Sequence, residues 1–99
     1  MNKAAAGMLG ILNRAGLLSF GGDVLPKMRK AALVLLASDA SENSLAKILP
    51  AAKTKGVETM VIGSKAELGA PLGYPELSAV LVLSKKAASS LKEKLQKGD

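Results

Sequence analysis

An unbroken apolar run, Ala31–Ala37, constrains the fold more than any other segment of this chain. It reads A-A-L-V-L-L-A and carries no polar residue at alternate positions. A strand with one face in solvent alternates apolar and polar side chains, whereas a strand covered on both faces stays apolar throughout. The run therefore predicts a strand in which Val34 and Leu36 are buried, within a sheet that helices cover on both faces.

Strand and helix patterns alternate along the rest of the chain. Three further apolar runs of strand length lie at 17–20, 57–62 and 79–83. Helical spacing of apolar residues predicts helices before Gly16, after Asp23, after Asp39, after Ser64 and at 85–96. This alternation predicts an α/β fold, a three-layer α/β/α sandwich with a mixed four-stranded sheet. Residues 1–99 are expected to form one domain.

Two of the helix starts carry capping patterns. Asp39 and Glu42 form a D-x-x-E box, with Ser41 as a competing cap. Ser64 and Glu67 form a full S-x-x-E box. An enzymatic interpretation would make Asp39 and Glu42 a catalytic carboxylate pair, but their spacing favours the capping role.

Two prolines lie inside expected helices. Pro26 falls in the first turn of the short second helix, which Asp23 is expected to cap, and its missing N–H is tolerated there. Pro50 falls further inside the third helix. Because an interior proline costs about 3 kcal/mol, it should kink or end that helix near Leu49.

The first helix has two interpretations. Lys3, followed by the apolar stretch Ala4–Leu12, imitates the start of a secretion signal, but no cleavage site follows it. Helical spacing on one face instead favours an amphipathic helix, with its apolar residues at Met8, Ile11, Leu12 and Ala15. Since no segment is long and apolar enough to span a bilayer, we expect a cytoplasmic protein without a membrane partner.

The composition excludes most enzyme classes. The chain contains no cysteine and no histidine. Disulfides, thiol nucleophiles, Cys/His metal sites and imidazole acid-base catalysis are therefore excluded. We expect a protein that is not an enzyme and that uses no cofactor, metal or small-molecule substrate.

The charge balance suits a polyanionic partner. The net charge is +6 and the isoelectric point is near 9.8, although the same charge could simply keep a small domain dispersed in water. Lys27, Arg29 and Lys30 cluster beside Gly21–Gly22, with only Asp23 to oppose them. An α-helix that starts here would add free N–H groups for phosphate, so the segment is either an RNA contact or a simple turn and cap.

Three motifs, in one order along the chain, carry a family resemblance. They are L-G-I-L-N-R-A-G at Leu9–Gly16, D-A-S-E-N-S at Asp39–Ser44 and S-K-A-E-L-G-A-P-L-G at Ser64–Gly73. Together they resemble bacterial members of the L7Ae ribosomal-protein family, small proteins that bind kink-turn RNA. The resemblance implies a three-layer sandwich that binds sharply bent RNA at one end, on or near the ribosome.

The resemblance also implies two RNA-binding segments. The family's G-x-N-E-x-x-K stretch corresponds to Gly21–Lys27, in which Gly21 and Lys27 fit while Asp23 and Val24 depart from the family pattern. The candidate residues on this side are Gly21, Gly22, Asp23, Lys27, Arg29 and Lys30. The second segment is the loop before the last strand, with Tyr74, Pro75 and Leu77. Tyr74 could stack on a base or simply pack over the sheet edge.

Three functional classes follow. We favour a non-catalytic RNA-binding protein whose partner is structured RNA, ribosomal RNA and the ribosome included. A protein-interaction module on the same fold is the alternative, since Asp23 and Val24 replace the residue types that read bases in the family. A third class is the RNA-recruiting arm of a methyltransferase, which we disfavour because no further domain accompanies it.

Overall fold

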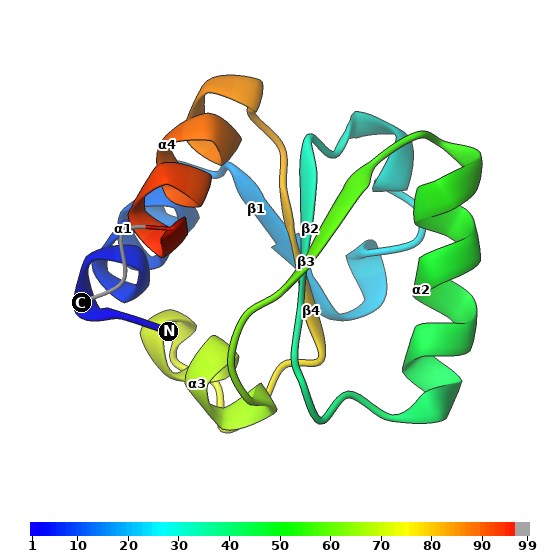
Figure 1. Ribbon diagram of the computed structural model, residues 1–99, viewed down its shortest axis with the longest axis horizontal. Coiled ribbons are helices and arrows are strands. Elements are labelled where there is room, and N and C mark those ends of the chain that lie inside the picture. The colour runs from blue at the N-terminus through cyan, green and yellow to red at the C-terminus, as the bar shows by residue number, and fades with distance from the viewer. Residues whose placement is uncertain (97–99) are drawn as a thin grey trace.

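A mixed four-stranded sheet divides this computed structural model, which describes residues 1–96, into two layers of helices (Figure 1). The strands are β1 (Leu18–Phe20), β2 (Leu33–Leu36), β3 (Glu58–Val61) and β4 (Ala79–Val82), and they lie in the order β1-β4-β2-β3. The pair β2 and β3 is parallel, whereas β4 is antiparallel to both β1 and β2. The predicted α/β class and mixed sheet are confirmed.

The helices cover both faces of the sheet unequally. Three of them, α1 (Lys3–Arg14), α3 (Lys65–Gly69) and α4 (Lys85–Gln96), lie on one face, and α2 (Glu42–Thr54) covers the other (Figure 1). The first face holds the larger apolar cluster, and the second holds a cluster built around Ile48 and Ala52 of α2. The three-layer sandwich expected from the sequence is thus confirmed.

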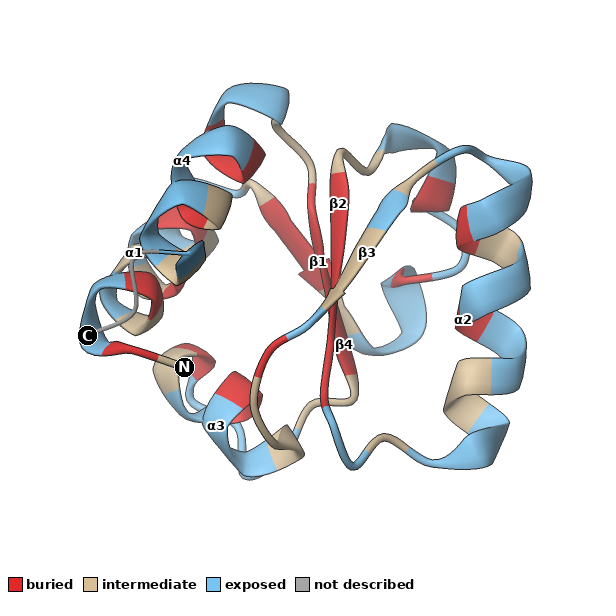
Figure 2. Cartoon of the chain, in the orientation of Figure 1, coloured by how far each residue is buried: buried red, intermediate tan, exposed pale blue. Residues whose placement is uncertain are grey.

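The two central strands are buried over their whole length (Figure 2). Val34 and Leu36 are 0% and 3% exposed and belong to the cluster under α2, whereas Leu33 and Leu35 belong to the cluster under α1 and α4. Burying each such side chain stabilises the fold by about 1.5–3 kcal/mol. The prediction for Val34 and Leu36 is confirmed.

The expected second α-helix is absent. In its place lie two 3₁₀ turns, η1 (Gly21–Asp23) and η2 (Met28–Lys30), and no side-chain cap begins either of them. Asp23 therefore ends η1 instead of capping a helix, and the prediction of a helix N-terminus at this point is wrong. Two glycines and a proline lower the helix propensity of this segment, and burial of Val24 and Met28 under α2 requires only single turns.

Two further helix predictions need correction. The helix α2 continues through Pro50 to Thr54, because Ile48 and Ala52 are buried on both sides of the exposed proline and hold the helix against the sheet. In α1 the buried side chains are those of Ala5, Leu9 and Leu12, while Ile11 is 59% exposed and Ala15 is exposed. The apolar face of α1 is thus rotated from the predicted one.

The capping pattern at Asp39–Glu42 differs from the predicted box. Ser41 is the cap, since its hydroxyl accepts the Ser44 backbone N–H at 3.1 Å. Asp39 instead accepts the Lys65 backbone N–H at 2.7 Å, which ties the loop after β2 to the start of α3. The carboxylate thus stabilises a contact between distant segments, and the predicted Asp39–Glu42 box is wrong.

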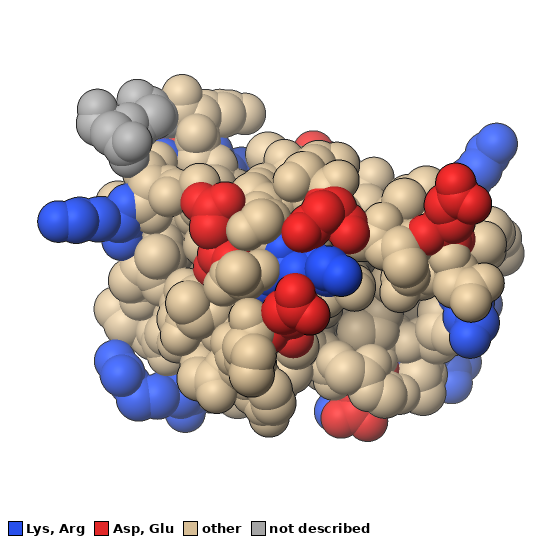
Figure 3. Space-filling view, turned by 90° about the horizontal axis from the view of Figure 1, so that it is seen from below, with Lys and Arg blue, Asp and Glu red and all other residues tan. Residues whose placement is uncertain are grey.

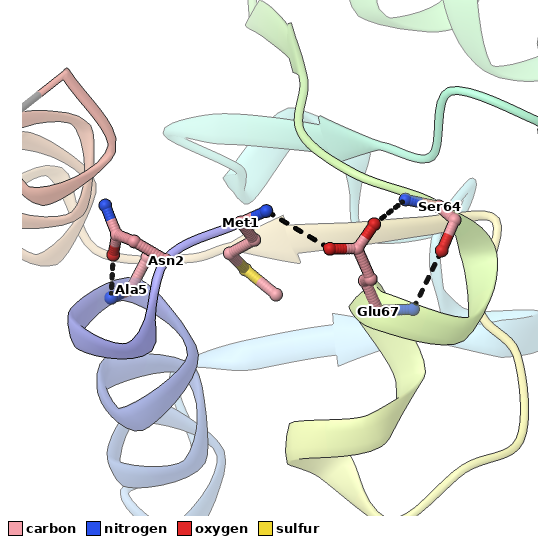
Figure 4. A network of polar contacts seen from close by, with 5 residues as sticks. All are labelled: Met1, Asn2, Ala5, Ser64 and Glu67. Carbon is pink, nitrogen blue, oxygen red and sulfur yellow. Dashed lines mark hydrogen bonds and ion pairs between the residues drawn. The ribbon is translucent and has the colours of Figure 1, made fainter. Parts of the chain in front are cut away.

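Polar contacts join α1, α3 and α4, which lie on the same face of the sheet, and Figure 4 shows those around α1 and α3. The predicted capping box at Ser64 and Glu67 is present. The Glu67 carboxylate also accepts from the Met1 amine at 3.3 Å, which connects α3 to the chain leading into α1. Asn2 caps α1 by accepting the Ala5 N–H at 2.8 Å, and its amide donates to the Lys94 carbonyl of α4 at 2.8 Å.

This network predicts an acid-sensitive contact. The Ser64 backbone N–H, and then the Met1 amine, hold the pKa of Glu67 below its ordinary value of 4.5. A carboxylate whose pKa is lower in the folded state than in the unfolded state stabilises the fold at pH values above its unfolded-state pKa. This stabilisation is lost as the pH falls through the folded-state pKa. We expect the melting temperature of the wild type to fall more steeply below about pH 4.5 than that of Glu67→Gln.

Circular dichroism melts between about pH 7 and pH 3 would measure this difference. Glu76→Gln, which removes an exposed loop carboxylate, is the matched control and should keep the wild-type profile. Identical profiles for the wild type and Glu67→Gln would contradict the role given to Glu67.

Candidate RNA-binding site

Two segments far apart in the sequence meet in one cleft of about 550 Å³, which also extends along β1 to Asn13 and Gly16 before that strand. One is Phe20–Asp23 with Lys27, and the other contributes Tyr74 and Leu77. Six of the predicted site residues therefore share one surface, namely Gly21, Gly22, Asp23, Lys27, Tyr74 and Leu77. Pro75 is exposed beside this lining.

An aromatic pair forms one wall of the cleft. The rings of Phe20 and Tyr74 meet edge to face, with centroids 5.1 Å apart and planes at 74°. Such a contact adds about 0.5–1.5 kcal/mol beyond burial and fixes the orientation of both rings. Tyr74 nevertheless remains 47% exposed, so it packs at the sheet edge and still offers ring surface to a ligand.

The loop that carries Tyr74 is held against α3 and the 3₁₀ turn η3 (Ala70–Leu72) by main-chain contacts. The Tyr74 N–H donates to the Gly69 carbonyl at 3.1 Å, and the Leu77 N–H donates to the Lys65 carbonyl at 3.0 Å. Gly73, at φ +82°, ends η3 in the left-handed conformation that glycine adopts readily. Because Asp39 accepts from the Lys65 N–H, the same anchor reaches the loop after β2.

Gly21 and Gly22 leave one side of the cleft open. A Cβ atom added at either position would meet nothing within 4 Å. Gly21 has φ +67°, a conformation that side chains disfavour, so this bare backbone cannot readily be covered by substitution. A ligand could therefore approach the main chain closely at this point.

The charge at this end of the sheet is mixed. Lys27 and Asp23 both line the cleft, and Glu76 lies exposed in the Tyr74 loop. Asp39 and Glu42 follow β2 at the same end. Figure 3 views the molecule from the side of α3, and acidic side chains gather near the middle of that face. An anion that enters the cleft therefore meets Lys27 together with Asp23, and further carboxylates lie exposed at the same end of the sheet.

Arg29 and Lys30 do not join the cleft. They lie in η2, directly before β2, and do not line the cleft, whereas Gly21 and Gly22 follow β1 at the level where β2 finishes and β4 begins. Val24, which replaces a base-reading residue of the family, is 5% exposed and packs in the core under α2. The basic cluster proposed from the sequence is thus divided between two ends of the sheet.

A second hollow of about 340 Å³ adjoins the cleft and was not predicted from the sequence. It shares Gly21, Gly22 and Leu77 with the first cleft and lies against the first half of α2. The α2 residues that line it are Ser44, Lys47 and Ile48. Lys47 adds a cation beside the Gly21–Gly22 backbone, and its place on a helix face gave no local sequence signal.

A family model matches residues 25–93, which include β2, β3, β4 and their helices. The chain belongs to the ribosomal protein L7Ae/L30e/S12e/Gadd45 family. The resemblance inferred from the three sequence motifs is thereby confirmed at the level of this family, and ribosomal proteins are among its named members.

Comparison with solved structures supports the same fold. A protein of unknown function from Bacillus halodurans C is 23% identical in sequence and superposes with a TM-score of 0.85. The aligned region covers 96% of this chain and 99% of that protein. At this identity the likeness concerns the fold alone. No curated protein matches the chain.

Within residues 1–96, no group of acidic side chains is arranged to hold a metal ion. Over the same residues, no helix is long and apolar enough to cross a membrane.

The packing of Gly69 predicts that the Tyr74 loop depends on that glycine. A Cβ atom at Gly69 would lie 2.7 Å from the Tyr74 carbonyl oxygen and 3.1 Å from the Glu76 nitrogen, so the backbone would have to shift. We expect Gly69→Ala to lower the free energy of unfolding by about 1–3 kcal/mol. It should also change the tyrosine fluorescence, which reports Tyr74 alone because the chain has one tyrosine and no tryptophan.

Gly7→Ala in α1 is the matched control, because a Cβ atom there meets nothing within 4 Å. It should stabilise the helix by about 0.5–1 kcal/mol and leave the fluorescence unchanged. Chemical denaturation and emission spectra would measure both effects. Equal, small effects of the two substitutions would refute the role of Gly69.

Proposed function

We propose that the protein is a non-catalytic RNA-binding protein that binds structured RNA, RNA of the kink-turn type included, in association with the ribosome and in the cytoplasm. The observation that carries the proposal is the cleft at the end of the sheet, in which an exposed aromatic ring, bare glycine backbone and a lysine lie together. Membership of a ribosomal-protein family supports it.

Each element of the cleft suits a different part of an RNA. Tyr74 offers a ring held by Phe20, on which an unpaired base can stack with a gain of about 1–3 kcal/mol. Lys27 can neutralise a phosphate, and the open backbone at Gly21–Gly22 allows the sugar-phosphate chain to approach closely. Unpaired, splayed bases occur in bent and looped RNA and not in a regular duplex.

Selectivity among structured RNAs should be modest. Val24 is buried and cannot reach a base edge, and Asp23 presents a negative charge at the cleft. Most of the binding free energy should then come from phosphate contacts, which carry no sequence information. The logarithm of the affinity should fall with the logarithm of the salt concentration by about 0.7–0.9 for each neutralised phosphate.

A pair of substitutions tests the cleft directly. Tyr74→Leu removes the stacking surface, and Lys27→Ala removes the cation. We expect Tyr74→Leu to weaken binding to a kink-turn RNA more than to a straight duplex, and Lys27→Ala to weaken both by similar factors. Fluorescence anisotropy titrations at two salt concentrations would measure this.

Lys94→Ala is the control, since Lys94 lies exposed in the last turn of α4. If Lys94→Ala abolishes binding while Tyr74→Leu and Lys27→Ala leave it intact, RNA binds elsewhere and the cleft is not the site.

Asp23 provides a test in the opposite direction. Asp23→Asn removes a negative charge from the cleft and keeps a side chain of similar size, so RNA affinity should rise several-fold at low salt. Glu42→Gln makes the same change in charge outside the cleft lining, in the first turn of α2, and should have a smaller effect. Equal gains would show that net charge alone controls binding.

The acidic residues favour a second candidate, a protein-interaction module on the same fold. Asp23, Asp39 and Glu76 lie at the end of the sheet where RNA is expected to approach. A basic protein surface would suit them through charge complementarity. Failure of the wild type to bind either RNA at low salt would favour this candidate over RNA binding.

A further inference from the structure

The end of the sheet opposite Gly21 and Tyr74 collects cationic side chains from three segments. Ala32, Glu58 and Val82 lie at one level of the sheet, because Leu33 pairs with both Glu58 and Val82 and the Ala32 N–H donates to the Val82 carbonyl at 2.7 Å. The chain just before or just after these strand ends carries the residues that we call the basic end: Arg29, Lys30, Lys53, Lys55, Lys85 and Lys86.

These segments meet around a shallow hollow. Its volume is about 330 Å³, and it is lined by the residues just before β2 and β3 and by one face of α4 from Lys85 to Lys92. Ala31, Gly56 and Lys85 are among its lining residues. Ala31 follows Lys30 in the sequence, Gly56 follows Lys55, and Lys85 itself belongs to the basic end. In Figure 1 the same segments meet at the top, where α2 ends and α4 begins.

The basic end is poorly neutralised by the protein itself. The acidic residue Glu58 lies at the same level of the sheet, but its carboxylate accepts from the Lys92 ammonium at 2.8 Å. Lys92 is not one of the six basic-end residues, so Glu58 is paired with a different cation. The basic-end side chains are exposed, and within residues 1–96 none of them forms an ion pair. Their charge therefore faces solvent, in contrast to the mixed charge at the cleft.

Lys85 and Lys86 are not explained by the stability of the fold. They occupy the first turn of α4, which contains no acidic residue and whose Ala87 N–H donates to the Ser84 hydroxyl at 3.2 Å. A cation in a first turn opposes the helix dipole and costs about 0.3–1 kcal/mol. Lys53 and Lys55, by contrast, lie where α2 ends and are favoured by its dipole.

We propose that the basic end binds the phosphate backbone of a second RNA segment, so that the protein bridges two parts of an RNA. This inference rests on the proposed RNA binding at the cleft. The described part of the chain measures 31 × 26 × 23 Å, and the hollow at the basic end shares no lining residue with the cleft. Gly21, Gly22 and Tyr74 of the cleft lie away from the basic end, so a folded RNA with one arm in the cleft can place a second arm there.

The chemistry of the basic end suits a regular duplex and not an unpaired loop. It presents lysine and arginine side chains and the free N–H groups of the first turn of α4, all of which contact phosphate. Phe20 and Tyr74, the two aromatic residues of the chain, are both at the cleft and leave no stacking surface here. The second segment is therefore held by its backbone, without sequence preference.

The experiment separates the two surfaces. The intact protein is first saturated with an unlabelled kink-turn hairpin at low salt, and a fluorescein-labelled straight RNA duplex is then titrated in. For the wild type, the anisotropy of the duplex should rise while a second dye on a tracer hairpin shows that the hairpin stays bound.

The variant Lys85→Gln/Lys86→Gln should lower the affinity for the duplex about tenfold and reduce the salt slope by about 1.4–1.8, while hairpin binding persists. Its melting temperature should stay constant or rise, because two cations leave a helix N-terminus. Lys3→Gln/Lys94→Gln removes the same charge from exposed positions outside the basic end and should change neither affinity by more than twofold.

Three outcomes would overturn the proposal. The first is that the duplex displaces the hairpin from the wild type, since both would then use one surface. The second is that both double variants weaken duplex binding equally, which would be an effect of net charge. The third is that Lys85→Gln/Lys86→Gln leaves duplex binding intact. If the hairpin binds and Tyr74→Leu weakens it, the proposed function survives each of these results; if the wild type binds neither RNA, both proposals fail.

Discussion

The antiparallel pairing of β2 with β4 is the constraint on which the rest of the structure depends. Both strands are apolar at every position and buried on both faces, so each needs a helical layer above and below it. Because β2 and β4 run in opposite directions, the segment that leads into β2 and the one that leaves β4 meet at one end, and the loops after β2 and before β4 meet at the other. The cleft and the basic end are direct consequences.

The elements that could be predicted from the sequence are those whose stability is local or repeats along the chain. The run at Ala31–Ala37 gives β2, the Ser64–Glu67 box gives the start of α3, and the pattern at 85–96 gives α4. The predicted Asp39–Glu42 box and a helix end near Leu49 were wrong because contacts with distant segments decide the structure there. Asp39 accepts from Lys65, and α2 continues past Pro50 because both flanking turns pack on the sheet.

The candidate site was harder to predict than the fold for a related reason. The convergence of Gly21, Lys27 and Tyr74 followed from a family resemblance, and no local pattern in the chain would have joined these segments. Proximity in sequence was misleading for Arg29 and Lys30, because the turns between Asp23 and Met28 carry the chain from one end of the sheet toward the other. Lys47 reaches the neighbouring hollow from α2, which only the packing of that helix reveals.

The distribution of charge carries more information about function than its sum. A net charge of +6 describes a moderately basic protein, yet Asp23, Asp39 and Glu76 lie at one end of the sheet and the six cations of the basic end lie at the other. Such a separation steers a polyanion toward the basic end at long range and leaves the cleft to discriminate by shape and stacking at short range. Salt screens the long-range attraction to the basic end, whereas base stacking in the cleft is not a charge interaction and is weakened less. The two ends would therefore contribute differently to RNA binding as ionic strength changes, the basic end to capture and the cleft to selection.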